Sequence, residues 1–357
     1  MKQLFSFVSA ILVAGTMCAQ TITIDGDNTD WATVPMLTEP GAEGPIVKMI
    51  IPQEGVGTTL PEDAAFTVMV EGDHAQILAG YPVIYTDADM NNTTGTAPWF
   101  APAMGYDYEM ATWSTGTWFE TNATGSVREM CLTKAAFDGV PFTGKLGAWL
   151  TFNWGALYIP ATPTMDEWAW SENDYHPFYV APYTYADLAG THTAEEIYST
   201  HRALHPSAPL QLGSDKITDP ELWASWTVEL KEATTYYITL DITGTTLASA
   251  DLWLVDPATN KVVAEFVGED IDAALGKQVY GSWNLSAVPA GKYMLKLKNH
   301  VEWATVALNA ITFSTEDPVT AIENTLVETT SKRIVENGQI YIIRGNERYN
   351  VLGTSVR

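Results

Sequence analysis

The chain has 357 residues, a formal net charge of −25 and a pI near 4.4. With 18 basic residues against 43 acidic ones, most of its surface repels phosphate, which excludes nucleic-acid binding and a polybasic membrane anchor. Thirteen tryptophans and sixteen tyrosines beside only 17% charged residues favour sheets and turns over helical bundles. We therefore expect an acidic, mostly β protein of about two domains.

The first residues predict a secretory signal at 1–19. Lys2 precedes an apolar run, residues 4–14, and small residues follow it. The run is too short to cross about 30 Å of hydrocarbon as a helix, and its pattern is typical of a cleavable signal peptide. Cys18 leaves a lipoprotein as the alternative. No second apolar run approaches transmembrane length, and we expect the remaining Cys131 to be a buried thiol without a disulfide.

Residues 20–187 are expected to form a first β domain. Short strand-like runs are broken there by clusters of Asp, Asn and Gly. The runs lie at 21–24, 66–70, 82–86 and 146–152. Residues 188–209 are expected to be a linker with a short helix, because Thr193 opens a helical stretch over 194–204.

Residues 210–315 are expected to form a second sandwich, because apolar residues alternate there with period two. The alternating sets are Tyr236, Ile238, Leu240 and Ile242, then Leu252 and Leu254, then Tyr293, Leu295 and Leu297. A polar linker at 316–331 precedes the tail. The predicted fold class is all-β, with two consecutive antiparallel, jelly-roll-like β-sandwiches and a small C-terminal β-meander.

The tail, residues 332–357, reverses the charge balance, with five basic residues against two acidic ones. Asn337-Gly338 between two apolar runs predicts a tight hairpin. A meander of this size is marginal alone, so the tail suggests an address or an anchor.

The sequence GQIYIIRGNERYNVLG at 338–353 resembles the C-terminal sorting domains of Bacteroidetes proteins exported by the type IX secretion system. The resemblance implies recognition by outer-membrane secretion machinery and a secreted or outer cell-surface location. An ordinary terminal hairpin is the alternative.

The first domain carries a second resemblance. Its elements are Ile22-Thr23-Ile24-Asp25-Gly26-Asp27 with Asp30-Trp31, then Asp87-Ala88-Asp89 with Asn91 and Thr94-Gly95, then Gly105-Tyr106-Asp107-Tyr108. In this order they are similar to family 9-like carbohydrate-binding modules, which have DOMON-like relatives. The resemblance implies a β-sandwich that binds sugars and often holds calcium.

The aspartates also suggest calcium by themselves. Carboxylate and amide oxygens on alternate residues of a loop converge on one point, and Ca²⁺ takes about six to eight such oxygens. Asp87, Asp89 and Asn91, with Asp107 from the next strand, are therefore the candidate ligands of a structural Ca²⁺. The alternative is an Asx-turn, in which the same side chains bind backbone amides.

Sugar binding needs flat apolar platforms edged by polar groups. Trp113 and Trp118 lie in a polar stretch broken by glycine, where burial is hard to arrange, and they are the first candidate platforms. Trp99 and Trp168 are further candidates. Two other tryptophans of this domain, Trp31 and Trp149, are expected in the core.

No catalytic motif is present: the sequence holds no H-E-x-x-H, G-x-S-x-G or C-x-x-C. His201 and His205 lie four residues apart, but the following Pro206 favours solvated side chains over a zinc site. We therefore expect a non-catalytic, secreted or surface protein that binds a polysaccharide or another glycan. A structural or adhesive surface or matrix protein is the second hypothesis, and a glycoside hydrolase with unrecognised carboxylates is the third.

Overall fold

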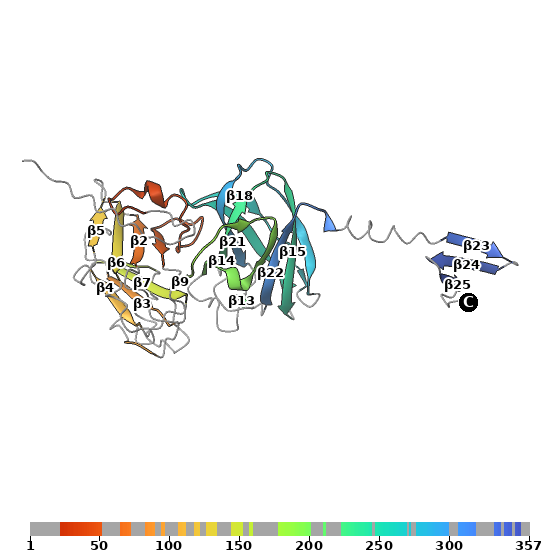
Figure 1. Ribbon diagram of the computed structural model, residues 1–357, viewed down its shortest axis with the longest axis horizontal. Helices are drawn as coiled ribbons and strands as arrows, with labels where there is room; N and C mark the ends of the chain where they lie inside the picture. Colours follow the sequence, from red (N-terminus) through yellow and green to blue (C-terminus); the bar gives the residue numbers. More distant parts are fainter. Residues whose placement is uncertain are drawn as a thin grey trace, which may run out of the picture.

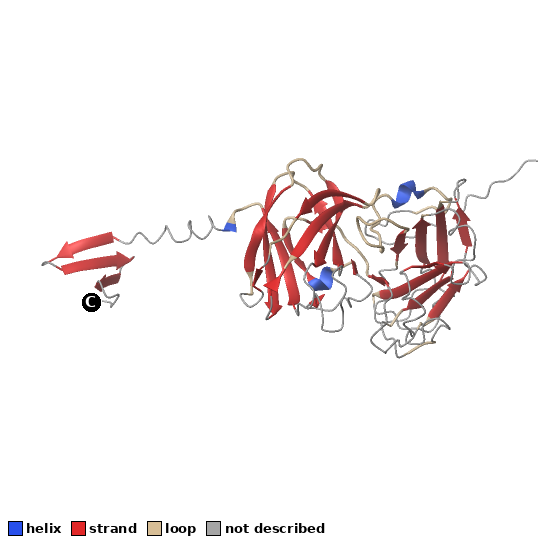
Figure 2. Ribbon diagram, turned by 180° about the vertical axis from the view of Figure 1, so that it is seen from behind, coloured by secondary structure: helices blue, strands red, loops and turns tan. Residues whose placement is uncertain are grey.

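The computed structural model consists almost entirely of β-strands, with short helical turns between them (Figure 2). It describes residues 22–51, 65–72, 83–89, 94–96, 106–111, 118–121, 126–133, 144–152, 157–159, 178–200, 210–211, 223–244, 247–269, 271–272, 276–299, 306–318, 332–336, 339–344 and 347–350. No helix in these ranges is long and apolar enough to cross a membrane. The predicted all-β class is confirmed, with two sandwiches followed by a C-terminal sheet (Figure 1).

The first sandwich, red to yellow-green in Figure 1, is built from two antiparallel sheets. The sheet of order β1-β2-β6-β5 contains β1 (Ile46–Ile50), β2 (Ala65–Glu71), β5 (Trp118–Thr121) and β6 (Val127–Thr133). The sheet of order β4-β3-β7-β8, with β9 also on β7, contains β3 (Val83–Asp87), β4 (Tyr108–Ala111), β7 (Leu146–Phe152), β8 (Leu157–Ile159) and β9 (Phe178–Val180). The predicted runs at 66–70, 82–86 and 146–152 therefore correspond to β2, β3 and β7.

The run at 21–24, expected as a strand, is irregular chain in its described part, residues 22–24. Carboxylates take the amides that a strand would need for a ladder. Thr23 N donates to Asp30 Oδ2 at 2.7 Å, and the amides at 25 and 26 donate to Glu129 Oε2. The segment then enters the 3-10 helix η1 (Asn28–Trp31), which packs on β2 and β6 through Trp31.

The second sandwich, green to blue in Figure 1, also has two main sheets. One has the order β10-β14-β21-β17-β18 with β12 on β14, and the other has the order β11-β22-β15-β20 with β13 on β22. The strands of the first are β10 (Ala186–Asp187), β12 (Ser199–Thr200), β14 (Trp223–Leu230), β17 (Ala250–Asp256), β18 (Lys261–Phe266) and β21 (Gly291–Asn299). Those of the second are β11 (Gly190–Thr193), β13 (Leu210–Gln211), β15 (Thr235–Gly244), β20 (Gln278–Asn284) and β22 (Val306–Ser314). A two-stranded sheet joins β16 (Leu247–Ala248) to β19 (Ile271–Asp272).

The linker expected at 188–209 belongs to the second sandwich in its described part, residues 188–200. There β11 pairs with β22 and β12 with β14. The helix expected over 194–204 is reduced to the 3-10 turn η5 (Ala194–Glu196), in which Glu196 accepts the amide proton of Thr193 at 2.8 Å. Pairing with β14 outweighs the local helical preference, so the chain extends again at once.

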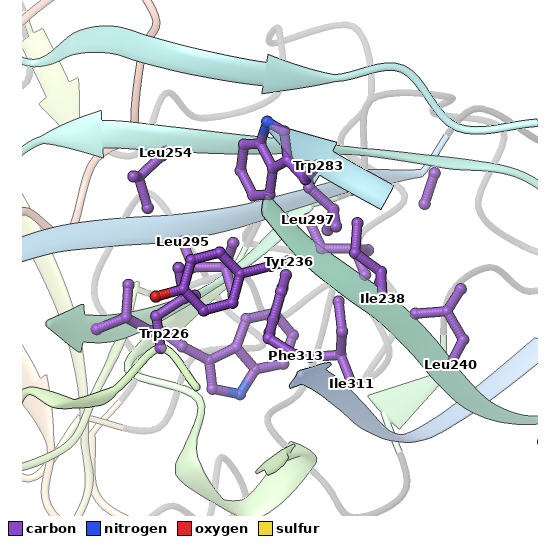
Figure 3. Close-up of a cluster of buried hydrophobic side chains, with 14 of the residues drawn as sticks. Trp226, Tyr236, Ile238, Leu240, Leu254, Trp283, Leu295, Leu297, Ile311 and Phe313 are labelled. Carbon is purple, nitrogen blue, oxygen red and sulfur yellow. The ribbon is translucent and has the colours of Figure 1, made fainter. Parts of the chain in front are cut away.

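The core of the second sandwich follows the predicted alternation. Along β15, every second residue is buried from Tyr236 to Ile242. Figure 3 shows Tyr236, Ile238 and Leu240 between the sheets together with Trp226, Trp283, Leu295 and Phe313. Such a core stabilises the fold because each large side chain gains about 1.5–3 kcal/mol on burial.

The two sandwiches pack against each other around two buried lysines. Lys48 of β1, 3% exposed, donates to the backbone oxygens of Trp31 in the first sandwich and Pro257 in the second, both at 2.8 Å. Lys296 of β21, fully buried, pairs with Glu39 at 2.5 Å. Each buried ammonium group thus bonds to one group from the opposite sandwich, and these bonds help to compensate its desolvation.

Further contacts make the junction continuous with the core of the first sandwich. That core cluster contains Tyr198, Val255 and Met294, which all come from the second sandwich. The side chain of Asn260 accepts a hydrogen bond from Gly41 N at 2.7 Å and donates one to the carbonyl oxygen of Ala42 at 2.9 Å. Gly41 has φ +82°, and a Cβ there would lie within 3.0 Å of the Trp253 ring, so the contact requires glycine. We conclude that the junction is a packed interface.

The tail forms its own sheet of β23 (Lys332–Glu336), β24 (Gln339–Arg344) and β25 (Glu347–Asn350). Glu336 lies opposite Gln339, which confirms the hairpin predicted around Asn337-Gly338. No described strand of the tail pairs with either sandwich (Figure 1).

Candidate functional site

Three of the predicted metal ligands come together at one edge of the sheet that contains β3 and β4. Asp87 is the last residue of β3 and is fully buried, Asp89 follows two residues later, and Asp107 directly precedes β4. One oxygen from each carboxylate lies within 4.8 Å of the other two. Asn91, the fourth expected ligand, lies outside the described residues.

Strand pairing explains why these residues meet. β3 and β4 are antiparallel with Thr86 opposite Tyr108, so the residues after β3 and before β4 share one edge. Asp107 N donates to Thr86 O at 2.7 Å. In return, Asp107 Oδ2 accepts the amide protons of Ala88 at 2.8 Å and Asp89 at 3.3 Å.

The loop between the two strands is closed by a bridge and a glycine. Thr96 and Tyr106 exchange backbone hydrogen bonds of 2.8 and 3.0 Å. Gly95 has φ +73°, and a Cβ there would collide with the carbonyl of Tyr106, so only glycine fits. Thr94 Oγ1 lies 2.9 Å from one carboxylate oxygen of Asp89 and 3.1 Å from the other, which fixes this side chain.

Asp107 experiences opposing electrostatic effects. Burial raises the pKa of its carboxyl group, the charge of Asp89 raises it further, and the amides of Ala88 and Asp89 lower it. Its Oδ1 accepts no hydrogen bond from any residue that the structure describes. A half-buried carboxylate beside two others is stabilised by a cation.

The cluster combines the two expected arrangements. One oxygen of Asp107 binds backbone amides, as in the Asx-turn alternative, while its other oxygen remains available. Ca²⁺ binds oxygen at about 2.3–2.6 Å, so oxygens up to about 5 Å apart can share one ion. The three carboxylates meet this limit. An all-oxygen set of this kind fits a hard cation such as Ca²⁺.

The candidate sugar platforms are mostly outside the described residues, as is true of Trp99, Trp113 and Trp168. Trp118 is the first residue of β5 and lies opposite Cys131 of β6. The core predictions are confirmed, since Trp31 is 0% exposed and Trp149 2%. Cys131 is also buried as expected, and burial raises the pKa of its thiol to about 11.

Two of the candidate platforms, Trp99 and Trp113, lie in segments that join different ends of β4. Segment 112–117, with Trp113, leaves the end of β4 that is remote from Asp107. Segment 97–105, with Trp99, begins and ends at the Thr96–Tyr106 bridge beside the carboxylates. Of these two segments, the one that contains Trp99 is joined to the bridge beside the cluster at both of its ends.

Sequence reasoning missed the role of Glu129 in β6. This carboxylate is fully buried and accepts hydrogen bonds from Trp31 Nε1 at 2.5 Å and from the amides of Asp25 and Gly26 at 2.9 and 2.5 Å. Burial raises its pKa, and these three donors oppose the shift. The signal was an acid in the middle of a strand-like run, VREMCLT. The opening motif is thus held to the sandwich through Glu129.

Three solved structures resemble parts of the chain. CsCBM6-3 from Clostridium stercorarium, solved in complex with cellobiose, is 11% identical over 37% of this chain and 98% of its own, with a TM-score of 0.26. The GH26-CBM35 β-(1,4)-mannanase of Podospora anserina is 15% identical over 36% of this chain and 28% of its own, with a TM-score of 0.24. The secreted serine protease VesC of Vibrio cholerae is 9% identical over 75% of this chain and 51% of its own, with a TM-score of 0.20.

At TM-scores this low, the likenesses support no conclusion about the function of this chain. No protein-family model matches the sequence, and no curated protein does either.

Proposed function

We propose that the chain is an exported, non-catalytic glycan-binding protein whose first sandwich holds a structural Ca²⁺ at Asp87, Asp89 and Asp107. The observation that carries the proposal is the convergence of three carboxylates from two strands, one of them fully buried. A cation there would offset their mutual repulsion and stabilise the connection between β3 and β4.

The position of the cluster connects calcium with sugar binding. The segment that contains Trp99 begins and ends at the bridge next to Asp107. An ion that orders this edge would hold the indole in place, and the C–H face of a pyranose ring can pack on an indole while polar groups bind its hydroxyls. Trp113 and Trp118 would form a separate platform.

Retention of the full-length protein on immobilised polysaccharides tests this proposal. We expect wild-type protein to bind at least one polysaccharide in the presence of Ca²⁺ and to bind it more weakly after chelation. Trp99→Ala should lose binding if the calcium-linked platform is the site, and the Trp113→Ala, Trp118→Ala double variant is the matched comparison. Equal retention of all three proteins, with and without chelator, would contradict the proposed site.

The proposed export depends on both ends of the chain. The signal-like residues 1–19 support entry into the secretory pathway. The basic tail, with its own three-stranded sheet, supports a sorting role at the outer membrane. Deletion of 332–357 should leave both sandwiches folded but hold the protein within the cell envelope. Release or surface display of the truncated protein at the wild-type level would contradict this role.

The packed junction favours a second candidate function, a rigid spacer in a surface structure. Lys48 and Lys296 tie the two sandwiches into one body, as a spacer requires. The polysaccharide screen distinguishes the candidates, because a spacer should fold and bind calcium without retaining any glycan.

A further inference from the structure

A small cavity lies where the chain passes from the first sandwich into the second. Its volume is about 170 Å³, and it is enclosed by segment 182–198 and by β14. This is several times the space that one water molecule needs. The cavity can therefore hold one small molecule or one ring of a larger one.

Aromatic side chains form part of the cavity wall. Tyr183, Tyr198 and Trp226 all line it, and the rings of Tyr183 and Tyr198 meet edge to face at 5.6 Å. Trp226 Nε1 donates to Thr193 O at 2.8 Å and the Tyr198 hydroxyl to Pro35 O at 3.3 Å. The polar atoms of these two residues are thus occupied, so they offer mainly apolar ring surface.

His192 of β11 adds a hydrogen-bond acceptor to this wall. It is 2% exposed, lines the cavity, and its Nε2 lies 3.2 Å from the carbonyl oxygen of Leu188. A carbonyl only accepts, so Nε2 carries the proton and Nδ1 of the neutral ring has a lone pair. Burial lowers the pKa of His192, which favours this neutral form. Among the described residues, Nδ1 has no hydrogen-bond partner.

Further polar groups of the lining are also available. Within the described part of the chain, Glu196 accepts only through Oε2, from Thr193, and so Oε1 is left for a ligand. The hydroxyl groups of Tyr183 and Thr184 make no hydrogen bond with described residues. Burial raises the pKa of Tyr183 to about 12, so its hydroxyl stays protonated and can donate. The lining thus contains two acceptors and two groups that both donate and accept.

We propose that this junction cavity binds a single pyranose residue, such as the end unit of a glycan. Ring hydroxyls would donate to His192 Nδ1 and Glu196 Oε1 and accept from Tyr183, while C–H groups would contact the aromatic wall. A small quaternary ammonium ion also suits aromatic rings and a carboxylate, but it has no acceptor for the Tyr183 and Thr184 hydroxyls and no proton for His192. The ligand class, although not the site, rests on the proposed glycan binding.

The test is a titration of the full-length protein with four sugars in the presence of a chelator, with binding measured by ligand-observed NMR. The sugars are D-glucose, D-mannose, D-galactose and N-acetyl-D-glucosamine. We expect at least one of these sugars to bind. The chelator should not prevent this binding, because none of the three candidate calcium ligands lines the cavity. Tyr183→Phe and Glu196→Gln should each weaken binding about tenfold, the effect of one lost hydrogen bond. Both variants keep the size of the side chain, and thermal melting verifies that they fold.

Tyr237→Phe on β15, which removes a hydroxyl outside the cavity, is the matched control and should bind like wild type. Absence of binding by all four sugars overturns the proposal, as does binding that neither cavity variant weakens. Tetramethylammonium binding without sugar binding overturns it too. The Trp99→Ala variant and the Trp113→Ala, Trp118→Ala double variant should keep the cavity binding, so failure of the cavity and failure of the first-sandwich site give different results.

Discussion

The two sandwiches differ in how far each supplies its own core. In the second, the buried cluster consists of residues from the second sandwich itself, such as Trp226, Tyr236 and Phe313 (Figure 3). In the first, the main cluster also includes Tyr198 and Met294, which belong to the second sandwich. The first sandwich therefore depends on the second for part of its stability.

The buried charges differ as well. The first sandwich buries Asp87, Arg128 and Glu129 and places Lys48 at the junction. The second sandwich buries Asp251, which accepts from Gly268 N, and places its fully buried Lys296 at the junction, against Glu39. Burying a charged group costs free energy unless the group is paired. The positions of buried charges therefore indicate sites with a role beyond core packing. By this criterion the first sandwich contains the candidate metal site.

The largest predicted effect concerns cooperativity between the sandwiches. Phe313→Ala in the second core and Phe66→Ala in the first should each cost about 3–5 kcal/mol of unfolding free energy. Hydrogen exchange should show that Phe313→Ala lowers protection in both sandwiches, because the first loses the packing of Tyr198 and Met294. Phe66→Ala should lower protection mainly in the first. If each variant lowered protection only in its own sandwich, the dependence of the first sandwich on the second would be contradicted.

Glu129 offers a sharper probe of the first sandwich. Glu129→Leu leaves three hydrogen-bond donors without an acceptor. Each buried donor without a partner should lower the free energy of unfolding by about 1–3 kcal/mol. Glu129→Gln keeps an acceptor oxygen at nearly the same size and should cost clearly less in urea unfolding. If the two variants lose the same free energy, the hydrogen bonds to Glu129 are not what holds the opening segment.

The junction predicts a pH dependence with a definite sign. Burial lowers the pKa of Lys48 to about 8 from its ordinary 10.5, with Glu71 and Asp256 opposing the shift. Between these values the unfolded chain binds a proton that the folded chain has released, so this lysine makes stability rise with pH, by up to about 3 kcal/mol. The free energy of unfolding of the wild type should therefore increase relative to that of Lys48→Met between pH 8 and pH 10.5. Chemical unfolding at a series of pH values measures this difference. Parallel pH profiles would show that Lys48 keeps an ordinary pKa.

Local patterns made part of this structure predictable. Period-two alternation predicted the core of the second sandwich, because a strand with one buried face repeats every two residues. Asp87 and Asp89 were predicted as ligands because they alternate in a loop after a strand-like run, with Asp107 added from the next strand, and the pairing of β3 with β4 does bring the three together. The Asn-Gly hairpin of the tail was predictable for a similar reason, since a two-residue turn sets its own register.

Contacts between distant parts of the chain could not be predicted in this way. The bond from Lys48 to Pro257 spans 209 positions, and no local pattern in either segment indicates the other. The segment at 188–200 has the residues of a short helix, yet β14 and β22 turn it into strands. Glu129 was missed because its donors come from residues about 100 positions away.

A calcium titration of the full-length protein by isothermal calorimetry tests the central claim most directly. Wild type should bind one Ca²⁺, and Asp107→Asn, which replaces a charged ligand at nearly constant size, should weaken binding about tenfold or more. Asp241→Asn on β15 is the control outside the cluster and should bind like wild type. Heat of binding in all three proteins with the same affinity, or in none of them, would contradict a calcium site at Asp87, Asp89 and Asp107.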